Sequence, residues 1–247
     1  MLGNIAKSVG LGALVLCAAV ARGADAPKID EQSNEVLKSV AAHLSSLKSF
    51  TYKAHAKSDT ISANNEKLTF DSEIAISLKR PNKIVAKKSG YEPMNFFFDG
   101  SKIVAFNPKS LMYASADESG DLDGLVKLLS KYQVEAPMSD FITSDPYTLL
   151  TGDVESGTYI GTAEIAGVKC HHLAMRQNNV DWQLWVDAGK EPLLKRFQVT
   201  SKGLTGSPSY TVDINSWISN PDLEDSLFEF SAPSTATKVE FKDLKAE

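Results

Sequence analysis

The sequence is poor in the residues and motifs from which catalytic and metal sites are most often built. Its 247 residues include two cysteines and four histidines: Cys17, Cys170, His43, His55, His171 and His172. It contains no Gly-x-Ser-x-Gly turn, no His-Glu-x-x-His, no phosphate-binding loop and no Cys-x-x-Cys. These absences favour a protein that is not an enzyme and that needs no cofactor. A hydrolase whose active site is dispersed along the chain is the remaining catalytic alternative.

The one grouping with metal-ligand chemistry is Cys170-His171-His172. On a strand, Cys170 and His172 share one face and His171 points to the other. A structural zinc site uses four convergent ligands, and Asp181 would join this group only if the next strand brought it close. The sequence therefore predicts no metal site, and instead a part-buried cysteine beside surface histidines.

The first 23 residues have the pattern of a cleaved secretory signal. A start with one basic residue, Lys7, precedes an apolar run over 9–20 that is too short to span a bilayer, and small residues follow at Ala21 and Gly23. Cleavage after either small residue predicts a mature protein exported to the periplasm. Leu16 precedes Cys17, where lipid attachment needs a small residue, so we expect no acylated N-terminus. The alternative of a permanent membrane anchor is disfavoured by the length of the run.

Charge and hydrophobicity restrict the partners of the mature chain. The formal net charge is −5, and no Lys/Arg cluster stands out beyond Lys87-Lys88, which argues against nucleic acid. No second apolar stretch approaches the ~18 residues of a membrane helix, so we expect no integral membrane protein. Cys170 would be alone after cleavage, which excludes an intramolecular disulfide. We predict a single domain over 24–247, with a helical insert near 121–150.

Hydrophobic periodicity predicts one leading helix followed by about ten short strands. Residues 30–47 carry an apolar stripe at three- and four-residue steps, typical of an amphipathic helix that Asp30 or Ser33 can cap. Alternation with a period of two, broken by turns such as Asp99-Gly100, predicts the strands. These lie at 50–57, 70–79, 84–86, 94–98, 102–106, 111–114, 159–165, 169–175, 182–186, 193–200 and 210–217.

The helical period returns over 121–132, and 137–150 is interpreted as a second short helical segment that Pro146 interrupts. We expect Pro221–Phe230 to form a short closing helix or turn and an edge strand, and the charged tail beyond Lys238 to fray. Together these elements predict an α+β fold, in which helices cover the concave face of a strongly curved antiparallel sheet, or half-barrel. This arrangement would enclose an apolar cavity, the usual place for a ligand.

Strand parity and the helical stripe select the side chains expected to line such a cavity, because each element turns its apolar residues to one face. They are Phe50, Tyr52, Phe70, Ile74, Ile76, Leu78, Phe96, Phe98, Leu125 and Leu129. Arg80 shares the parity of the apolar residues that precede it, and burial of an unpaired guanidinium is costly. Two interpretations stay open. Arg80 pairs with a carboxylate at the sheet rim, or it lies at the cavity mouth and binds the polar head of an amphipathic ligand.

The stretch Leu78-Lys79-Arg80-Pro81-Asn82-Lys83-Ile84, followed by Asp99-Gly100-Ser101-Lys102, a short hydrophobic-aromatic strand and Asn107-Pro108, resembles the LolA/LolB-like superfamily of periplasmic lipoprotein carriers. The later block Cys170–Ala174, with Asp181–Val186 and Pro192, resembles a subfamily of predicted periplasmic proteins of unknown function. The resemblance covers roughly residues 30 to 230. It implies a helix-plugged half-barrel, a hydrophobic cavity, and Arg80 at the position of an arginine that matters for ligand transfer. The helical segment at 121–150 and the Cys-His-His block depart from the carriers' pattern.

Two functional hypotheses follow. Export, the predicted helix-covered sheet and Arg80 favour a non-catalytic periplasmic binding protein, a carrier or sensor of a lipid-like or acylated hydrophobic ligand, with a lipoprotein as one such ligand. The alternative is a regulatory module of the envelope that contacts a protein partner, a use that the resemblance also implies. In that case the segment 121–150 would form the contact.

Overall fold

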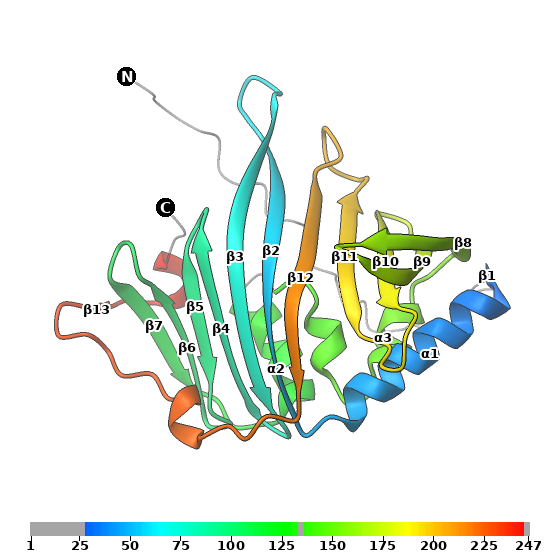
Figure 1. The fold of residues 1–247 in the computed structure, drawn as a ribbon. Helices are drawn as coiled ribbons and strands as arrows, with labels where there is room; N and C mark the ends of the chain where they lie inside the picture. Colours follow the sequence, from blue (N-terminus) through cyan, green and yellow to red (C-terminus); the bar gives the residue numbers. More distant parts are fainter. Residues whose placement is uncertain (1–27, 133–135, 245–247) are drawn as a thin grey trace, which may run out of the picture. The chain divides into compact units, whose positions relative to one another are not determined.

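The computed structural model describes residues 28–132 and 136–244, and the predicted signal and its cleavage site lie outside these residues. The helices are α1 (Glu31–Ser46), α2 (Leu122–Lys131), η1 (Ser139–Ile142), α3 (Pro146–Thr151), η2 (Asp225–Phe228) and η3 (Phe241–Asp243). The strands are β1 (Lys28–Ile29), β2 (Ser49–Ile61), β3 (Lys67–Lys79), β4 (Lys83–Gly90), β5 (Met94–Phe98), β6 (Lys102–Asn107), β7 (Met112–Asp117), β8 (Ser156–Ile165), β9 (Val168–Arg176), β10 (Val180–Asp187), β11 (Leu194–Ser201), β12 (Ser209–Ser219) and β13 (Thr237–Lys238) (Figure 1).

The described residues fall into two compact units. The first unit comprises the chain up to His43, Lys57–Phe70 and Asp145–Val212, and the second comprises Leu44–Ala56, Asp71–Ser144 and the chain from Asp213 onward. Strand order is β1-β8-β9-β10-β11-β12 in the first unit and β12-β2-β3-β4-β5-β6-β7-β13 in the second, and β2, β3 and β12 contribute residues to both. Within the units, β1–β8 and β13–β7 are parallel and the other registered pairs are antiparallel. The predicted α+β class with a mostly antiparallel sheet is confirmed.

Helix α1 begins at Asp30, one of the two caps that the sequence predicts. The Asp30 carboxylate accepts a hydrogen bond of 2.7 Å from the main-chain N–H of Ser33, which satisfies one of the free donors at the helix start. The same carboxylate accepts 2.6 Å from Tyr159 N–H in β8, so one side chain fixes both the helix and the neighbouring strand. Leu37 and Val40 on the apolar stripe are completely buried.

In the second unit, the strand register defines two faces of the sheet between β3 and β7. Cross-strand partners lie on the same side of a sheet. Leu78 pairs with Ile84, Ile84 with Phe98, and Phe98 with Ile103. Two residues along the strands, a second row runs through Ile76, Ala86, Phe96, Ala105 and Ala114. We call the face that carries these two rows the inner face and the opposite one the outer face.

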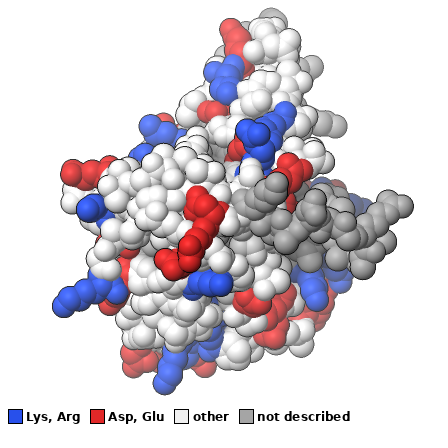
Figure 2. Space-filling model, turned by 90° about the vertical axis from the view of Figure 1, so that its right-hand side faces the viewer, with Lys and Arg blue, Asp and Glu red and all other residues white. Residues whose placement is uncertain are grey.

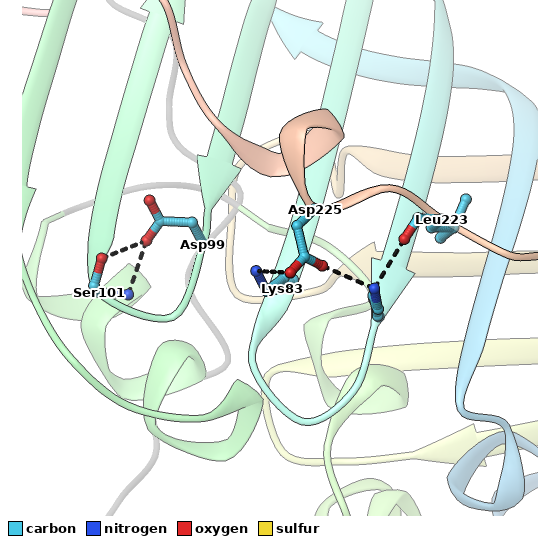
Figure 3. Close-up of polar contacts among 6 residues, drawn as sticks. Lys83, Asp99, Ser101, Leu223 and Asp225 are labelled. Carbon is cyan, nitrogen blue, oxygen red and sulfur yellow. Dashed lines mark hydrogen bonds and ion pairs between the residues drawn. The ribbon is translucent and has the colours of Figure 1, made fainter.

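The outer face is covered by the C-terminal segment. The ring of Phe230 lies 5.3 Å from Phe97, 5.4 Å from Phe106 and 5.3 Å from Tyr113, three outer-face residues from three strands. Asp225 binds Lys79 at 2.8 Å and Lys83 at 3.2 Å, and Lys79 Nζ also donates 2.9 Å to the carbonyl of Leu223 (Figure 3). These contacts attach the segment to the β3–β4 hairpin.

Three details of the sequence prediction are wrong. Pro146 begins α3 instead of interrupting a helix, because proline is well suited to the first helical turn and Asp145 caps it by accepting a hydrogen bond from Thr148 N–H. The edge strand lies at Thr237–Lys238, beyond the predicted Pro221–Phe230. The tail does not fray directly after Lys238, since the Val239 N–H donates 2.8 Å to the Tyr113 carbonyl.

Candidate ligand-binding face

The inner face of the second unit is apolar, and its burial changes along the strands. The row nearest the β3–β4 turn is buried, with Leu78, Phe98 and Ile103 at 0% exposure and Ile84 at 6%. In the next row, Phe96 is 8% exposed and Ile76 is partly exposed. A third row, formed by Ile74, Lys88 and Met94, is partly exposed throughout. The face is therefore packed at one end and accessible at the other.

Helix α2 and η1 are attached at the packed end. The main-chain N–H of Leu122 donates 3.0 Å to the carbonyl of Pro81, which joins the start of α2 to the end of β3. The apolar stripe of α2 is buried, as the sequence predicts, at Leu122, Leu125, Val126 and Leu129. Because the C-terminal segment covers the outer face, we infer that α2 and η1 bury the first row of the inner face.

Arg80 connects the helices to the sheet through main-chain carbonyls. Its Nη1 donates 2.8 Å to the carbonyl of Ile142 at the end of η1, and its Nη2 donates 3.3 Å to the carbonyl of Leu44 in the last turn of α1. The last carbonyls of a helix lack regular intrahelical partners, although Leu44 also accepts 3.4 Å from the Leu47 N–H. A positive charge at this end interacts favourably with the helix dipole. Burial lowers the pKa of Arg80, and Asp123 partly compensates. Among the described residues no carboxylate lies within ion-pair distance, so the predicted rim ion pair is absent.

Charge is distributed unequally between the two faces. Across β3 to β7, the outer face carries charged side chains of both signs: Glu73, Lys79, Lys83, Lys87, Lys102 and Asp117. The inner-face positions of the same strands include one charged residue, Lys88, and no acidic residue. Lys88 Nζ lies 5.8 Å from the centre of the Tyr91 ring. The inner face is therefore an apolar surface with a cation at its accessible end.

Register brings some of the predicted site residues together. Ile74, Ile76, Leu78, Phe96 and Phe98 share the inner face, as strand parity predicts. Phe50 and Tyr52 instead stack with Trp217 of β12, at 4.8 and 5.4 Å. Phe70 belongs to the first unit. A role in ligand binding for the whole set stays a prediction.

Lys88 was missed because its strand was predicted to end at Ala86. The alternating apolar pattern of β4 stops there, and Lys87-Lys88-Ser89 carries no strand signal of its own. The strand continues to Gly90 because β3 pairs with it as far as Gly90 and β5 pairs with it as far as Lys88. Continuing the alternation from Ile84 and Ala86 by two residues would have placed Lys88 on the inner face.

The Cys-His-His block lies in the first unit and its side chains have other partners. Cys170 is completely buried, and burial, reinforced by Asp187, raises the pKa of its thiol. His171 Nδ1 lies 2.8 Å from the Tyr159 hydroxyl, and the His172 ring stacks 4.2 Å from that of Trp185. Asp181 binds Lys202 at 2.7 Å. In the described part of the chain, no three His, Cys, Asp or Glu side chains are grouped closely enough to hold a metal ion.

The surface gives no indication of a polyanionic partner on the side shown in Figure 2. Lys and Arg side chains there are interspersed with Asp and Glu, in agreement with the net charge of −5. Among the described residues, no helix is both long and apolar enough to cross a bilayer.

Comparison with known proteins gives a family and a fold. A family model described as "Predicted periplasmic protein (DUF2092)" matches residues 33–242. No curated protein matches the sequence. A crystal structure of an uncharacterized conserved protein from Thermus thermophilus is similar with a TM-score of 0.51 and 9% identity, covering 85% of this chain and 99% of that one.

Two further structures are similar at lower scores. The Mycobacterium tuberculosis lipoprotein LppX has a TM-score of 0.43 and 13% identity, covering 79% of this chain and 99% of its own. A LolA superfamily protein from Nitrosomonas europaea has a TM-score of 0.36 and 10% identity, covering 79% and 96%. The predicted resemblance to a subfamily of predicted periplasmic proteins of unknown function is confirmed by the family model.

Proposed function

Because the chain belongs to the family of predicted periplasmic proteins (DUF2092), we propose that it is a non-catalytic periplasmic binding protein, a carrier or sensor of a lipid-like or acylated ligand. The ligand binds along the inner face of the second unit, between the sheet and α2. An acyl chain is the chemistry that such a face accepts, because each buried methylene contributes about 0.8 kcal/mol and no polar partner is required.

The observation that supports this proposal is the gradient of burial on the inner face. A face that served only as core would be buried along its whole length, whereas Ile74, Ile76 and Met94 stay partly exposed beside the completely buried Leu78 and Phe98. Partly exposed apolar residues that continue a core surface are typical of a ligand site. Leu125 and Leu129 of α2 would form the opposite wall.

Two measurements test the proposal. Lipids extracted from protein purified from its native envelope should include a stoichiometric acylated species, identified by mass spectrometry. Purified protein should also bind a fluorescent fatty-acyl probe saturably, with an affinity that depends on chain length.

A variant locates the site. Ile76→Asn places a polar amide on the partly exposed second row and should weaken probe binding by about tenfold, since it interrupts apolar contact. Ile218→Asn is the matched control, because Ile218 is 58% exposed on β12 and should leave the affinity unchanged. Thermal melts of both variants separate loss of binding from loss of fold.

The absence of saturable binding across several chain lengths would contradict the proposal. In that case, cross-linking in the native envelope tests the alternative, a protein partner that contacts segment 121–150. Recovery of a hydrolysed probe in place of the intact one would instead reveal a hydrolase.

A further inference from the structure

Three aromatic side chains of β2 and β12 stack on one another within the second unit. The Trp217 ring of β12 lies 4.8 Å from the Phe50 ring and 5.4 Å from the Tyr52 ring of β2, with interplanar angles of 23° and 7°. In the sheet, β2 is the neighbour of β3, and β12 follows β2. We call these three residues the aromatic group.

A contact between β2 and β3 shows on which face the aromatic group lies. Asp71 has the parity of the outer-face positions of β3. The Nε2 atom of His55 lies 2.8 Å from the Asp71 carboxylate, so His55 of β2 is also on the outer face. Phe50 and Tyr52 are an odd number of positions from His55, and alternation therefore places them on the inner face. Trp217 shares this face because it stacks with both.

Burial decreases along the aromatic group as it does along β3. The main-chain N–H of Arg80 donates 2.8 Å to the carbonyl of Lys48, which places the start of β2 at the packed end of the inner face. Phe50, two residues further along, is 2% exposed, whereas Tyr52 and Trp217 are partly exposed. The accessible part of the apolar face therefore continues across β2 to β12.

The Trp217 ring can be covered by a hydrocarbon chain without leaving a polar donor unsatisfied. Its Nε1–H already donates 3.2 Å to the hydroxyl of Ser219. The inner-face positions of β2 from Phe50 to Ala56 carry no charge, and the charged side chains of this segment alternate to the outer face. The partner that matches this part of the face is an uncharged, apolar chain.

We propose that the acyl chain of the ligand crosses the strands, from the part of the inner face beside α2 toward β12, and that its far end packs against Trp217. This inference rests on the proposed acyl-binding function, to which it adds the direction of the chain and a residue that sets the preference for chain length. Two strand spacings, about 10 Å, separate β12 from β3. Short chains therefore bind without reaching Trp217, and long chains contact it.

The test uses saturated fatty acids from decanoic to octadecanoic acid, titrated into the full mature chain by calorimetry. Wild-type affinity should rise with chain length over the whole series. Trp217→Ala should weaken the longest acids about tenfold, because it removes apolar contact equivalent to roughly two methylenes, and leave decanoic acid within about twofold. Loss of the fold would instead weaken every acid, and thermal melts identify it.

Tryptophan fluorescence gives a readout that a purely structural role of the stack would not produce. The chain has three tryptophans, and Trp182 and Trp185 are buried in the first unit, at 4% and 7% exposure. Octadecanoic acid should exclude water from the partly exposed Trp217 ring and move the emission to shorter wavelength. Trp217→Phe keeps an aromatic ring, so it should retain affinity within about twofold and lose this shift.

Ile218→Ala is the matched control. Ile218 is the next residue of β12, it is 58% exposed, and alternation places it on the outer face. This variant should leave the affinity for every chain length and the emission shift unchanged.

The outcomes separate this inference from the proposed function. Failure of the wild type to bind any acid of the series contradicts both. An equal loss for all chain lengths in Trp217→Ala, or no loss for any, contradicts the role of Trp217 and leaves acyl binding intact. An emission shift that persists in Trp217→Phe also contradicts it, because the shift would then come from the tryptophans of the first unit.

Discussion

The Nη1 atom of Arg80 donates a hydrogen bond of 2.8 Å to the main-chain carbonyl of Ile142, the last residue of η1. Together with the bond from Nη2 to Leu44, it makes Arg80 a shared cap for two helix ends. The sequence leaves a structural and a ligand-binding interpretation of Arg80 open, and these two bonds favour the structural one. The arginine lies at the packed end of the inner face, and the accessible end carries a lysine.

Arg80→Leu should destabilise the protein. The substitution removes the Arg80 donor from the carbonyls of Ile142 and Leu44, although Leu44 keeps the bond of 3.4 Å from the Leu47 N–H. An unsatisfied, partly buried carbonyl costs about 1–3 kcal/mol. Urea unfolding followed by circular dichroism measures the loss, and Arg80→Lys should recover part of it. An unchanged midpoint for Arg80→Leu would contradict the capping role and restore the interpretation in which Arg80 serves the ligand.

Much of the second unit can be predicted from local sequence. The parts that cannot be predicted have one cause in common, which is pairing between segments distant in the chain. Asp99-Gly100 fixes the β5–β6 hairpin, and strand parity then places Phe96 and Phe98 on the same face as Leu78. Strand parity cannot show that β4 continues through Lys88, because Lys87-Lys88-Ser89 has no alternating apolar pattern. Main-chain pairing with neighbouring strands keeps these residues in β4. Sequence reasoning therefore predicts the apolar face and misses its cation.

The C-terminal segment illustrates the same limit. Phe228 and Phe230 follow a short stretch rich in Asp and Glu, which has no periodic pattern. Phe230 acquires its role from Phe97, Phe106 and Tyr113, which are more than a hundred residues earlier in the chain. Such a contact between distant segments becomes visible only when the register of the sheet is known.

Phe228→Ala should be strongly destabilising. Phe228, at the end of η2, is 1% exposed, and the loss of a buried aromatic ring costs about 3–5 kcal/mol. Its neighbour Leu227 is 37% exposed, so Leu227→Ala should change stability by about 0.5 kcal/mol or less. Chemical denaturation of the pair measures the difference. Equal effects would show that burial of the Phe228 ring does not help to hold the C-terminal segment.

The Cys170 thiol should be inert in the folded protein. The side chain is completely buried and its pKa is raised, so both access and the fraction of reactive thiolate are low. Iodoacetamide at pH 8 should modify Cys170 slowly, and urea should restore the rate expected for an exposed thiol. Peptide mass spectrometry follows the site directly. Rapid modification without denaturant would indicate local opening of β9.

Asp140→Asn should stabilise the protein more at neutral pH than at acid pH. Asp140 in η1 is 9% exposed, and burial raises the pKa of its carboxyl group above the ordinary value of 3.8. In this case the native state holds the proton more tightly than the unfolded state, so stability falls as pH rises from 3.8 through the raised native pKa. An amide does not ionise and avoids this loss, whereas below the ordinary value both side chains are neutral. The advantage of the variant should therefore grow between pH 4 and pH 7.5, measured by thermal melts. Asp153→Asn, an exposed position between α3 and β8, serves as the control and should show no such trend. An advantage that is constant over this range would mean that Asp140 ionises in the folded protein as readily as in the unfolded chain.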